Sequence, residues 1–311
     1  MSLFKFTHKQ AHSCKMIKSK TFVSLCLIAP CLSTVTFAQL QGRVLSKESQ
    51  RAIPYATIYL KNNAVGCHAD EHGEFILDAK GITKDSVYIQ SVGYTTLRIA
   101  FQNAVSTSSF YLTESPITLQ TVNVQKQKQT SSIWKGATED HKGFIFGQMG
   151  GSMLREVALY IPNDEKKEGF LNAAGFYVVR FGKHKTPFRV RVYEPDGDMP
   201  GKDLLTENVV IHASGPNRYC TVDLRKYNIP FGKNGVFISM EWLNLNDKKY
   251  YYDVKYRNSK AVNTFYGQQI GLSNEFEELQ GRVRINKGDW KTMTMGYASP
   301  MFKVKIDFYE D

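Results

Sequence analysis

The stretch VGCHADEHGEFIL, residues 65–77, decides between two different folds for the first part of the chain. Within it, His68-Ala-Asp-Glu71-His72 matches the H-x-x-E-H pattern of one class of zinc peptidase. His68-x-x-Glu71 alone has the spacing of the first two zinc ligands in metallocarboxypeptidases. A site built on H-x-x-E-H needs a helix, because only helical spacing brings its first and fifth positions onto one face. The same residues also fit a turn between two strands.

The residues between the two histidines favour the turn. Asp70 and Gly73 occupy the first and fourth positions of a four-residue segment, where a type I turn prefers these residue types. The Asp70 carboxylate can accept a hydrogen bond from a backbone N–H two residues on, and Gly73 can adopt a positive φ. A third zinc ligand would have to come from a histidine outside any second ligand motif. We therefore expect the tip of a hairpin, at which His68 and His72 are dispensable.

Apolar residues alternate with other residues on both sides of this turn. Such period-two patterns, rich in β-branched and aromatic residues, predict half-buried antiparallel strands and a small β-sandwich. The inward-facing residues expected are Ala56, Ile58 and Leu60, then Phe75 and Leu77, then Val87 and Ile89, and finally Leu97, Ile99 and Phe101.

The order of these features resembles the carboxypeptidase-regulatory-like domain. The matching residues are Gly42-x-Val44, Ile53-Pro54-x-Ala56-x-Ile58, Gly66, Asp70-x-x-Gly73-x-Phe75-x-Leu77 and Gly93-Tyr94; the departures are Ser46 and Cys67. The resemblance implies a transthyretin-like Greek-key β-sandwich without catalytic residues, which serves as an accessory or docking unit. Similar domains lie behind zinc carboxypeptidases and at the front of bacterial TonB-dependent outer-membrane receptors. We place this domain at residues 39–113.

Residues 1–38 are typical of a secretory signal peptide. Five lysines and no acidic residues precede an apolar run that ends in Thr36-Phe37-Ala38, with small residues at the expected cleavage positions. Translation from Met1 or from Met16 would give such a signal. Lipidation at Cys31 is disfavoured, because Pro30 precedes it where a small residue is expected. The pattern predicts an exported protein that is periplasmic, outer membrane-associated or extracellular, with no transmembrane helix after cleavage.

Charge and cysteine content exclude two further classes of protein. The formal net charge of +11 includes the five lysines of residues 1–38, so the remainder carries about +6. These charges are spread along the chain, whereas a nucleic-acid-binding protein concentrates them in one patch. Only Cys67 and Cys220 follow the expected cleavage point, about 150 residues apart. They predict buried free thiols and no disulfide framework.

The rest of the chain predicts a linker and a second, larger β-sandwich. Residues 114–141 combine an alternating run, ITLQTVNVQ, with the polar segment QKQKQTSS, which is typical of a linker. In FRVRVY we expect Phe188 and Val190 to face inward, and Arg189 and Arg191 to face water. Residues 142–311 contain nine short alternating runs, which indicate a jelly-roll-like sandwich: 143–147, 155–163, 175–183, 188–196, 208–214, 219–227, 235–243, 279–287 and 302–310.

Two groups in the second sandwich are candidate ligand sites. Aromatic rings beside loops could stack on sugars, and we select Trp242, Tyr251, Trp290 and Tyr297. Asp196, Asp198 and Asp203 offer oxygen donors for a metal ion, although a solvated turn explains them better because the full calcium-loop pattern is missing.

Catalytic motifs are not apparent. Glu277, Glu278 and nearby Asp289 are not fixed as a pair, and GQMGGS lacks the Gly-Lys-Ser/Thr of a phosphate loop. The leading hypothesis is therefore an exported, non-enzymatic, all-β envelope or cell-surface protein that binds a partner protein or a glycan, with no cofactor. The alternatives are a glycan-directed hydrolase with a site in the loops of the second sandwich and a structural spacer.

Overall fold

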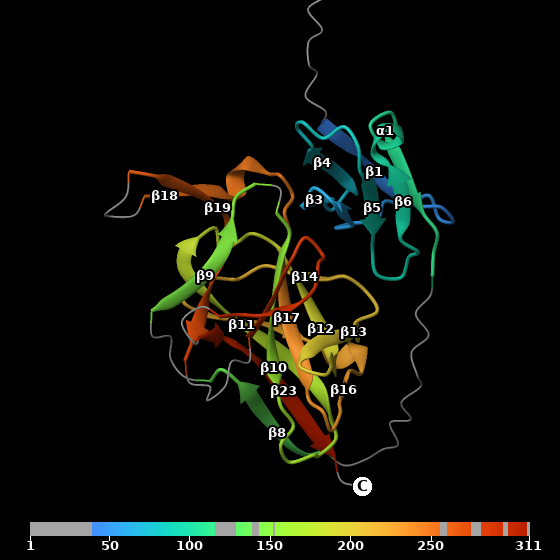
Figure 1. Cartoon of the computed structure of the whole chain (residues 1–311). Coiled ribbons are helices and arrows are strands. Elements are labelled where there is room, and N and C mark those ends of the chain that lie inside the picture. Colours follow the sequence, from blue (N-terminus) through green and yellow to red (C-terminus); the bar gives the residue numbers. More distant parts are fainter. Residues whose placement is uncertain are drawn as a thin grey trace, which may run out of the picture. The chain divides into compact units, whose positions relative to one another are not determined.

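The computed structural model describes residues 39–115, 129–138, 143–151, 153–255, 260–274, 281–294 and 298–309, with only the backbone at 129 and 130. Strands are the main secondary structure of these residues, which all belong to one compact unit, Phe37–Asp311. The described part contains one four-residue α-helix, α1 (Phe101–Ala104), and two short 3₁₀ turns, η1 (Arg225–Tyr227) and η2 (Lys248–Tyr250). The expected all-β class is confirmed (Figure 1).

The first part of the chain folds into two sheets around one core. A four-stranded sheet has the order β3-β2-β5-β6, and a three-stranded sheet has the order β4-β1-β7. All their ladders are antiparallel except that between β1 and β7. The strands are β1 (Gln39–Ser46), β2 (Thr57–Leu60), β3 (Val65–His68), β4 (Glu74–Asp78), β5 (Ser86–Gln90), β6 (Leu97–Ala100) and β7 (Ser109–Leu112).

Alternation along these strands builds the first core, as expected. Ile58 and Ile89 from one sheet meet Val44, Phe75 and Phe110 from the other in a single buried cluster. The expected hairpin, however, is not formed. Strands β3 and β4 belong to different sheets, so Asp70–Gly73 is a turn that carries the chain from one layer of the sandwich to the other. A sequence pattern of two strands around a tight turn does not distinguish these two arrangements.

The second part of the chain forms two larger antiparallel sheets. One runs β13-β12-β17-β10-β20-β21 with β14 on β12, and the other runs β18-β19-β11-β23-β8 with β9, β15, β16 and β22 alongside. The first sheet contains β10 (Arg155–Ile161), β12 (Phe188–Asp196), β13 (Met199–Asp203), β14 (Val209–Ile211), β17 (Val236–Trp242), β20 (Gly281–Ile285) and β21 (Lys291–Thr292). The other contains β8 (Gln129–Gly136), β9 (Phe144–Met149), β11 (Gly169–Gly182), β15 (Arg218–Asp223), β16 (Pro230–Phe231), β18 (Tyr251–Lys255), β19 (Val262–Ser273), β22 (Ser299–Pro300) and β23 (Phe302–Tyr309).

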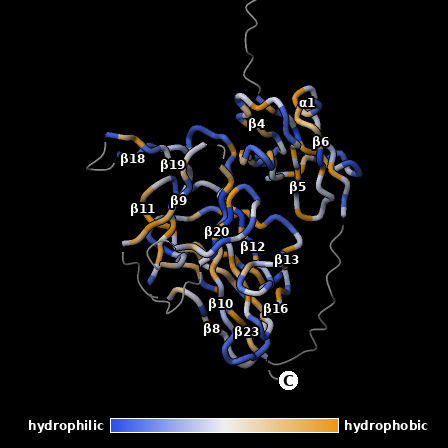
Figure 2. Tube along the Cα trace, viewed as in Figure 1, coloured by the Kyte–Doolittle hydropathy of each residue, from blue (hydrophilic) through white to orange (hydrophobic). Residues whose placement is uncertain are grey.

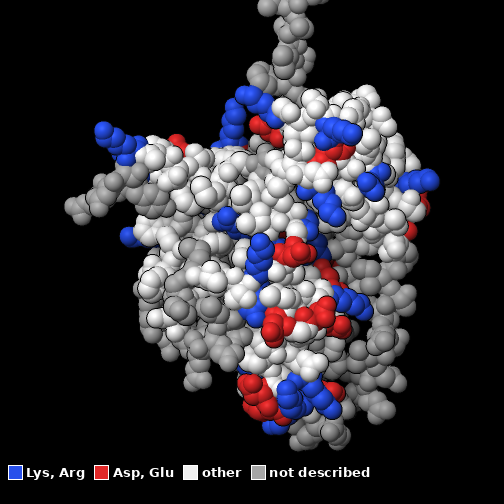
Figure 3. Space-filling view, viewed as in Figure 1, with Lys and Arg blue, Asp and Glu red and all other residues white. Residues whose placement is uncertain are grey.

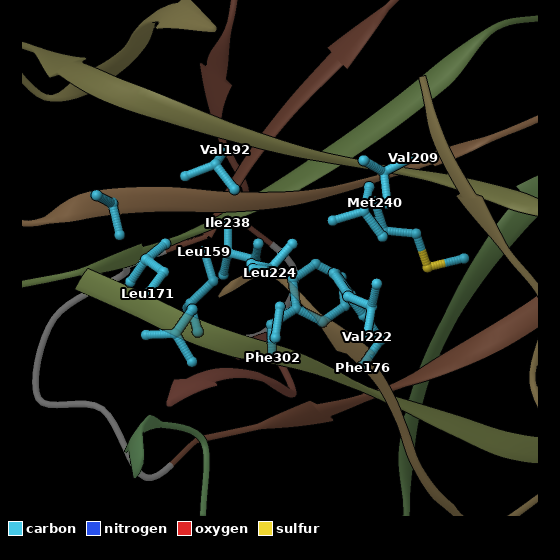
Figure 4. Close-up of a cluster of buried hydrophobic side chains, with 14 of the residues drawn as sticks. Leu159, Leu171, Phe176, Val192, Val209, Val222, Leu224, Ile238, Met240 and Phe302 are labelled. Carbon is cyan, nitrogen blue, oxygen red and sulfur yellow. The ribbon is translucent and has the colours of Figure 1, made fainter. Parts of the chain in front are cut away.

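A single hydrophobic core lies between these two sheets, as a β-sandwich requires. Figure 4 shows Leu159, Val192 and Ile238 from one sheet beside Leu171 and Phe302 from the other. Hydrophobic and hydrophilic residues alternate along many of the strands (Figure 2). Burying one face of each sheet against the other removes the apolar half of each strand from water, which is the main favourable term in folding.

The nine expected runs of the second part each contain a strand, but other strands were not expected. Strand β8 begins inside the segment expected to be a linker, and it pairs with β23. Strand β19 is long, yet Gly267, at φ +74°, and two glutamines interrupt its apolar alternation. The ladder to β11 is irregular there. The alternating run 117–125 lies outside the described residues.

Two further expectations concern single features of the described residues. Cys67 and Cys220 are both free and buried, as predicted. None of the helices in the described ranges combines the length and the hydropathy needed to cross a lipid bilayer.

Candidate functional site

Four charged residues lie in one row across the outer face of the seven-stranded sheet. Arg189 on β12 is opposite Glu241 on β17, which is opposite Glu156 on β10, which is opposite Arg284 on β20. Their chain neighbours, such as Val190 and Val157, point to the core on the other face. We call these four residues the charged row.

Burial of Arg189 and Arg191 contradicts the expectation that the arginines of FRVRVY face water. Only 1% of Arg189 and 7% of Arg191 are exposed. Residues of the four-stranded sheet region cover this face, because the Arg189 guanidinium donates to Thr57 Oγ1 (3.2 Å) and to the carbonyl oxygen of Tyr55. The expectation assumed that one face of the strand contacts water. Here both faces of the strand are covered, so its polar residues are buried as well.

The centre of the row places two carboxylates side by side. Like charges directly opposite each other destabilise a sheet, and a third residue resolves this conflict. Lys287 Nζ lies 2.5 Å from Glu241 Oε1 and 3.8 Å from Glu156 Oε2. Burial lowers the pKa of the Lys287 ammonium to about 8, against the attraction of Glu241. Lys287 therefore neutralises the repulsion between the two glutamates.

Lys287 reaches this position through a tight turn. The Gly288 N–H donates to the Ile285 carbonyl (3.0 Å), and the two central residues, Asn286 and Lys287, have φ of +50° and +58°. This left-handed conformation costs about 1–2 kcal/mol for a residue that has a Cβ, because the Cβ comes close to the following carbonyl oxygen. Asn286 anchors the turn, since its Oδ1 accepts from the backbone N–H of Leu154 (2.8 Å). The chain thus holds a lysine in a strained conformation to deliver its charge.

Each glutamate of the row is held as an anion. Arg189 Nη1 lies 2.9 Å from Glu241 Oε2, and Arg284 Nη2 lies 2.6 Å from Glu156 Oε2. The Glu156 carboxylate also accepts from the hydroxyls of Tyr193 and Ser239, each at 2.7 Å. Burial raises the pKa of both carboxyls, but the neighbouring cations outweigh burial and the net pKa of each is lowered. Carboxylates held ionised in this way are not set to donate a proton, and removing one of their partners would leave an uncompensated buried charge.

His68, from the zinc-like motif, is part of the same network. The Asn244 backbone N–H can only donate, and it points to His68 Nδ1 at 3.0 Å. The ring proton must therefore be on Nε2, which donates to Glu241 Oε1 at 3.2 Å. Burial lowers the pKa of the imidazole to about 4, so the ring is neutral at pH 7. His68 is consequently a buried partner of Glu241, so from the structure we expect its substitution to matter, unlike the expectation from the sequence.

The rest of the motif behaves as the turn that was expected. The Asp70 carboxylate accepts from the His72 N–H (2.8 Å) and the Glu74 N–H (2.9 Å), and Gly73 has φ +75°. The His72 side chain is 68% exposed and faces Glu71. The two histidines therefore point to different environments, and the described residues contain no group of three His, Cys, Asp or Glu side chains that could hold a metal ion.

A hollow of about 290 Å³ opens beside the charged row. Its walls come from the four-stranded sheet region, β12, the β13 segment and the turn that carries Lys287. Charged side chains lining it are Arg191, Arg284, Lys287 and Asp203. Arg191 Nη1 and Asp203 Oδ2 form an ion pair at 2.6 Å. Cationic side chains of the network therefore line a surface that is partly open to solvent.

The aromatic residues chosen from the sequence are not gathered into one binding face. Trp242 is fully buried, where its Nε1 donates to the Gln268 carbonyl (2.8 Å). Tyr251 is half-buried and packs edge-on against Tyr266. Trp290 is half-buried with the Arg284 guanidinium 4.5 Å from its ring centroid. Tyr297 lies outside the described residues. Trp242 thus belongs to the core and has no face available for a sugar.

The three aspartates chosen as metal donors also differ from one another in surroundings. Asp196 and Asp198 are exposed, whereas Asp203 is paired with Arg191 and accepts from the Leu205 N–H (3.0 Å). Burial raises the pKa of the Asp203 carboxyl, partly offset by Arg191. Asp203 is therefore a residue of the hollow.

The class of the first part follows from these features: it is a two-sheet β-sandwich that contributes a buried histidine to a neighbouring sheet. Residues 40–124 match the model of the CarboxypepD_reg-like domain family, so the chain carries this domain and the resemblance is confirmed. The match extends past the expected end at 113. No curated protein matches the chain.

The charged row was missed because each strand was interpreted alone. Taken one strand at a time, the charged residues of the network are typical of a strand face exposed to water. They are Glu156, Glu241, the Arg-x-Arg of 189–191 and the Arg-x-Arg of 282–284. One feature of the sequence was consistent with such a network: charged residues alternate with apolar residues in several strands of one domain. The strand order is needed to show that these residues are neighbours. It places the two glutamates on the central strands and one arginine on the strand at each side of them.

Proposed function

We propose that this chain is an exported, non-enzymatic protein of the cell envelope that binds a partner protein or a glycan. The observation that carries the proposal is the CarboxypepD_reg-like domain, a binding or regulatory type of module, joined by His68 to the outer face of a second sandwich. A buried polar junction of this kind holds binding surfaces in fixed positions. The domain then acts as a docking unit.

The state of the two central carboxylates supports a non-catalytic role. A glycosidase needs one carboxyl held protonated as the acid and one ionised carboxylate, both facing the sugar. Glu156 and Glu241 are 2% and 1% exposed, and both have a lowered pKa. They therefore serve the junction, and a hydrolase would need a different pair of acids.

Surface charge supports a partner other than nucleic acid. On the face shown in Figure 3, the Lys and Arg atoms of the described residues lie among Asp and Glu atoms and form no continuous basic patch. Binding of nucleic acid depends on many clustered cations that neutralise phosphates. A glycan or a protein surface suits the mixed face better.

A binding screen paired with an activity screen tests the proposal. The purified chain is applied to a glycan array and to immobilised envelope proteins, and in parallel to chromogenic glycoside and ester substrates. We expect saturable binding to at least one surface and no turnover. Turnover that follows the protein through purification, without saturable binding, contradicts the proposal and favours the hydrolase.

Export is tested separately, by cell fractionation. Residues 1–38 have the composition of a signal peptide, so we expect the chain in the envelope fraction or the medium. A variant without residues 1–38 should stay in the cytoplasm. Equal distribution of both forms contradicts export by this segment.

A further inference from the structure

The ion network around the hollow has one more cation than carboxylates. Its cations are Arg189, Arg191, Arg284 and Lys287, and its carboxylates are Glu156, Glu241 and Asp203. His68 adds no charge at neutral pH, because its ring is neutral. Buried charge is costly unless it is balanced. A single negative charge in the hollow would balance this network.

Arg191, which lines the hollow, also has a buried donor without a partner in the described residues. The Arg191 side chain is 9% exposed and uses Nη1 for Asp203, while its buried Nε donates to none of the residues that the structure describes. A guanidinium offers donors in a planar fork, which matches the two oxygens of a carboxylate. Arg191 lines the hollow, so its positive charge attracts an oxyanion bound there, although the buried Nε itself does not open into the hollow.

The other walls of the hollow suit hydroxyl groups. Polar side chains without charge line it together with the cations, and they are Thr57, Gln90, Ser91, Thr96 and Tyr193. Hydroxyls and amides both donate and accept, so they can pair with the hydroxyls of a polyol. A hollow of about 290 Å³ is at the small end of ligand sites. One ring with several hydroxyls and one acidic group fits these walls.

We propose that this hollow binds a uronic acid unit, with the carboxylate toward Arg191, Arg284 and Lys287 and the ring hydroxyls toward Gln90, Ser91 and Thr96. The inference rests on the proposed function and narrows its glycan ligand to an acidic one. The single excess charge selects a carboxylate over a doubly charged phosphate. Asp203 stays paired with Arg191, which limits its repulsion of the ligand.

Calorimetric titration of the full chain with D-glucuronate tests the proposal. D-glucose is the neutral control, acetate tests the carboxylate alone, and inorganic phosphate tests any oxyanion. We expect saturable binding of glucuronate that is at least about tenfold tighter than that of the other three, or about 1.4 kcal/mol. No saturation with glucuronate, or equal binding of phosphate or acetate, overturns the proposal.

A matched pair of variants locates the binding in the hollow. Thr96 is exposed and lines the hollow, whereas its neighbour Thr95 is exposed and does not line it. Thr96→Glu adds a negative charge to the site and should weaken glucuronate binding about tenfold or more, while Thr95→Glu should leave it unchanged. Equal effects of the two substitutions contradict the assignment. Thermal melting of both variants verifies that each is folded.

The outcomes also separate this inference from the proposed function. If neutral glycans or a protein surface bind but glucuronate does not, the uronic acid site is wrong and the binding function stands. If glucuronate binds and the chain also hydrolyses glycosides, the non-enzymatic function is wrong while the site in the hollow remains.

Discussion

His68 Nε2 lies 3.2 Å from Glu241 Oε1, although 173 positions of the chain separate the two residues. The contact joins the CarboxypepD_reg-like domain to the outer face of the seven-stranded sheet. Glu241 is itself held by Arg189 and Lys287. This buried hydrogen bond, together with those from Arg189 to Thr57 and Tyr55, therefore connects the domain to the ion network.

Substitution of His68 should destabilise the protein. His68→Ala removes one hydrogen bond from Glu241, leaves the Asn244 N–H without its buried acceptor and opens a cavity, which together cost about 2–4 kcal/mol of the free energy of unfolding. Urea denaturation followed by tryptophan fluorescence measures this loss. His72→Ala is the matched control, because the His72 side chain is 68% exposed. It should change the free energy of unfolding by less than about 0.5 kcal/mol, and equal losses would contradict the burial of His68.

The fold should weaken as the pH falls below 6.5. The pKa of His68 is lowered from 6.5 to about 4 when the protein folds, in surroundings that include Glu241, Arg189 and Lys287. Between these values the unfolded chain binds the proton and the folded chain does not, so stability declines with falling pH by a total of about 3 kcal/mol.

Urea unfolding at pH 7, 6, 5.5 and 5 measures the larger part of this decline, because unfolded carboxyl groups have a pKa near 4 and titrate mainly below about pH 5. His68→Gln replaces the ring with an amide that does not titrate. The variant should therefore lose most of the slope over this range. An unchanged slope would assign the acid sensitivity to other groups.

Removal of the Lys287 charge should expose the repulsion between Glu156 and Glu241. Lys287→Gln breaks a buried pair and should cost about 3–5 kcal/mol of the free energy of unfolding. Adding Glu156→Gln removes one of the two facing carboxylates, so the double variant should lose less than the sum of the two single losses. Strict additivity in urea denaturation would show that Lys287 does not compensate this pair.

Gly73 should tolerate a side chain far less than Gly81 does. Both glycines have positive φ, +75° and +77°, but a Cβ at Gly73 would lie 2.7 Å from the Val44 carbonyl oxygen, whereas one at Gly81 meets nothing within 4 Å. We expect Gly73→Val to lose at least about 2 kcal/mol more than Gly81→Val. Thermal unfolding of both variants measures the difference, and equal losses would mean that φ alone sets the cost.

Local patterns in the sequence predicted the elements but not the surfaces between them. Alternation placed Ile58, Phe75 and Val190 in cores, and Asp70 with Gly73 defined a turn. These features depend on a few neighbouring residues. The burial of Arg189 and the role of His68 depend on contacts across more than 130 positions, so no local pattern contains them. Strand β19 was missed because buried glutamines and Gly267 break its alternation.

A double-mutant cycle between His68 and Glu241 tests the central claim, that this buried contact joins the two parts of the chain. The free energy of unfolding is measured for the unmodified chain, His68→Ala, Glu241→Gln and the double variant. The account predicts a coupling energy of about 1–3 kcal/mol between the two positions. A coupling energy within about 0.3 kcal/mol of zero would contradict it, because residues in direct contact within one network do not act independently.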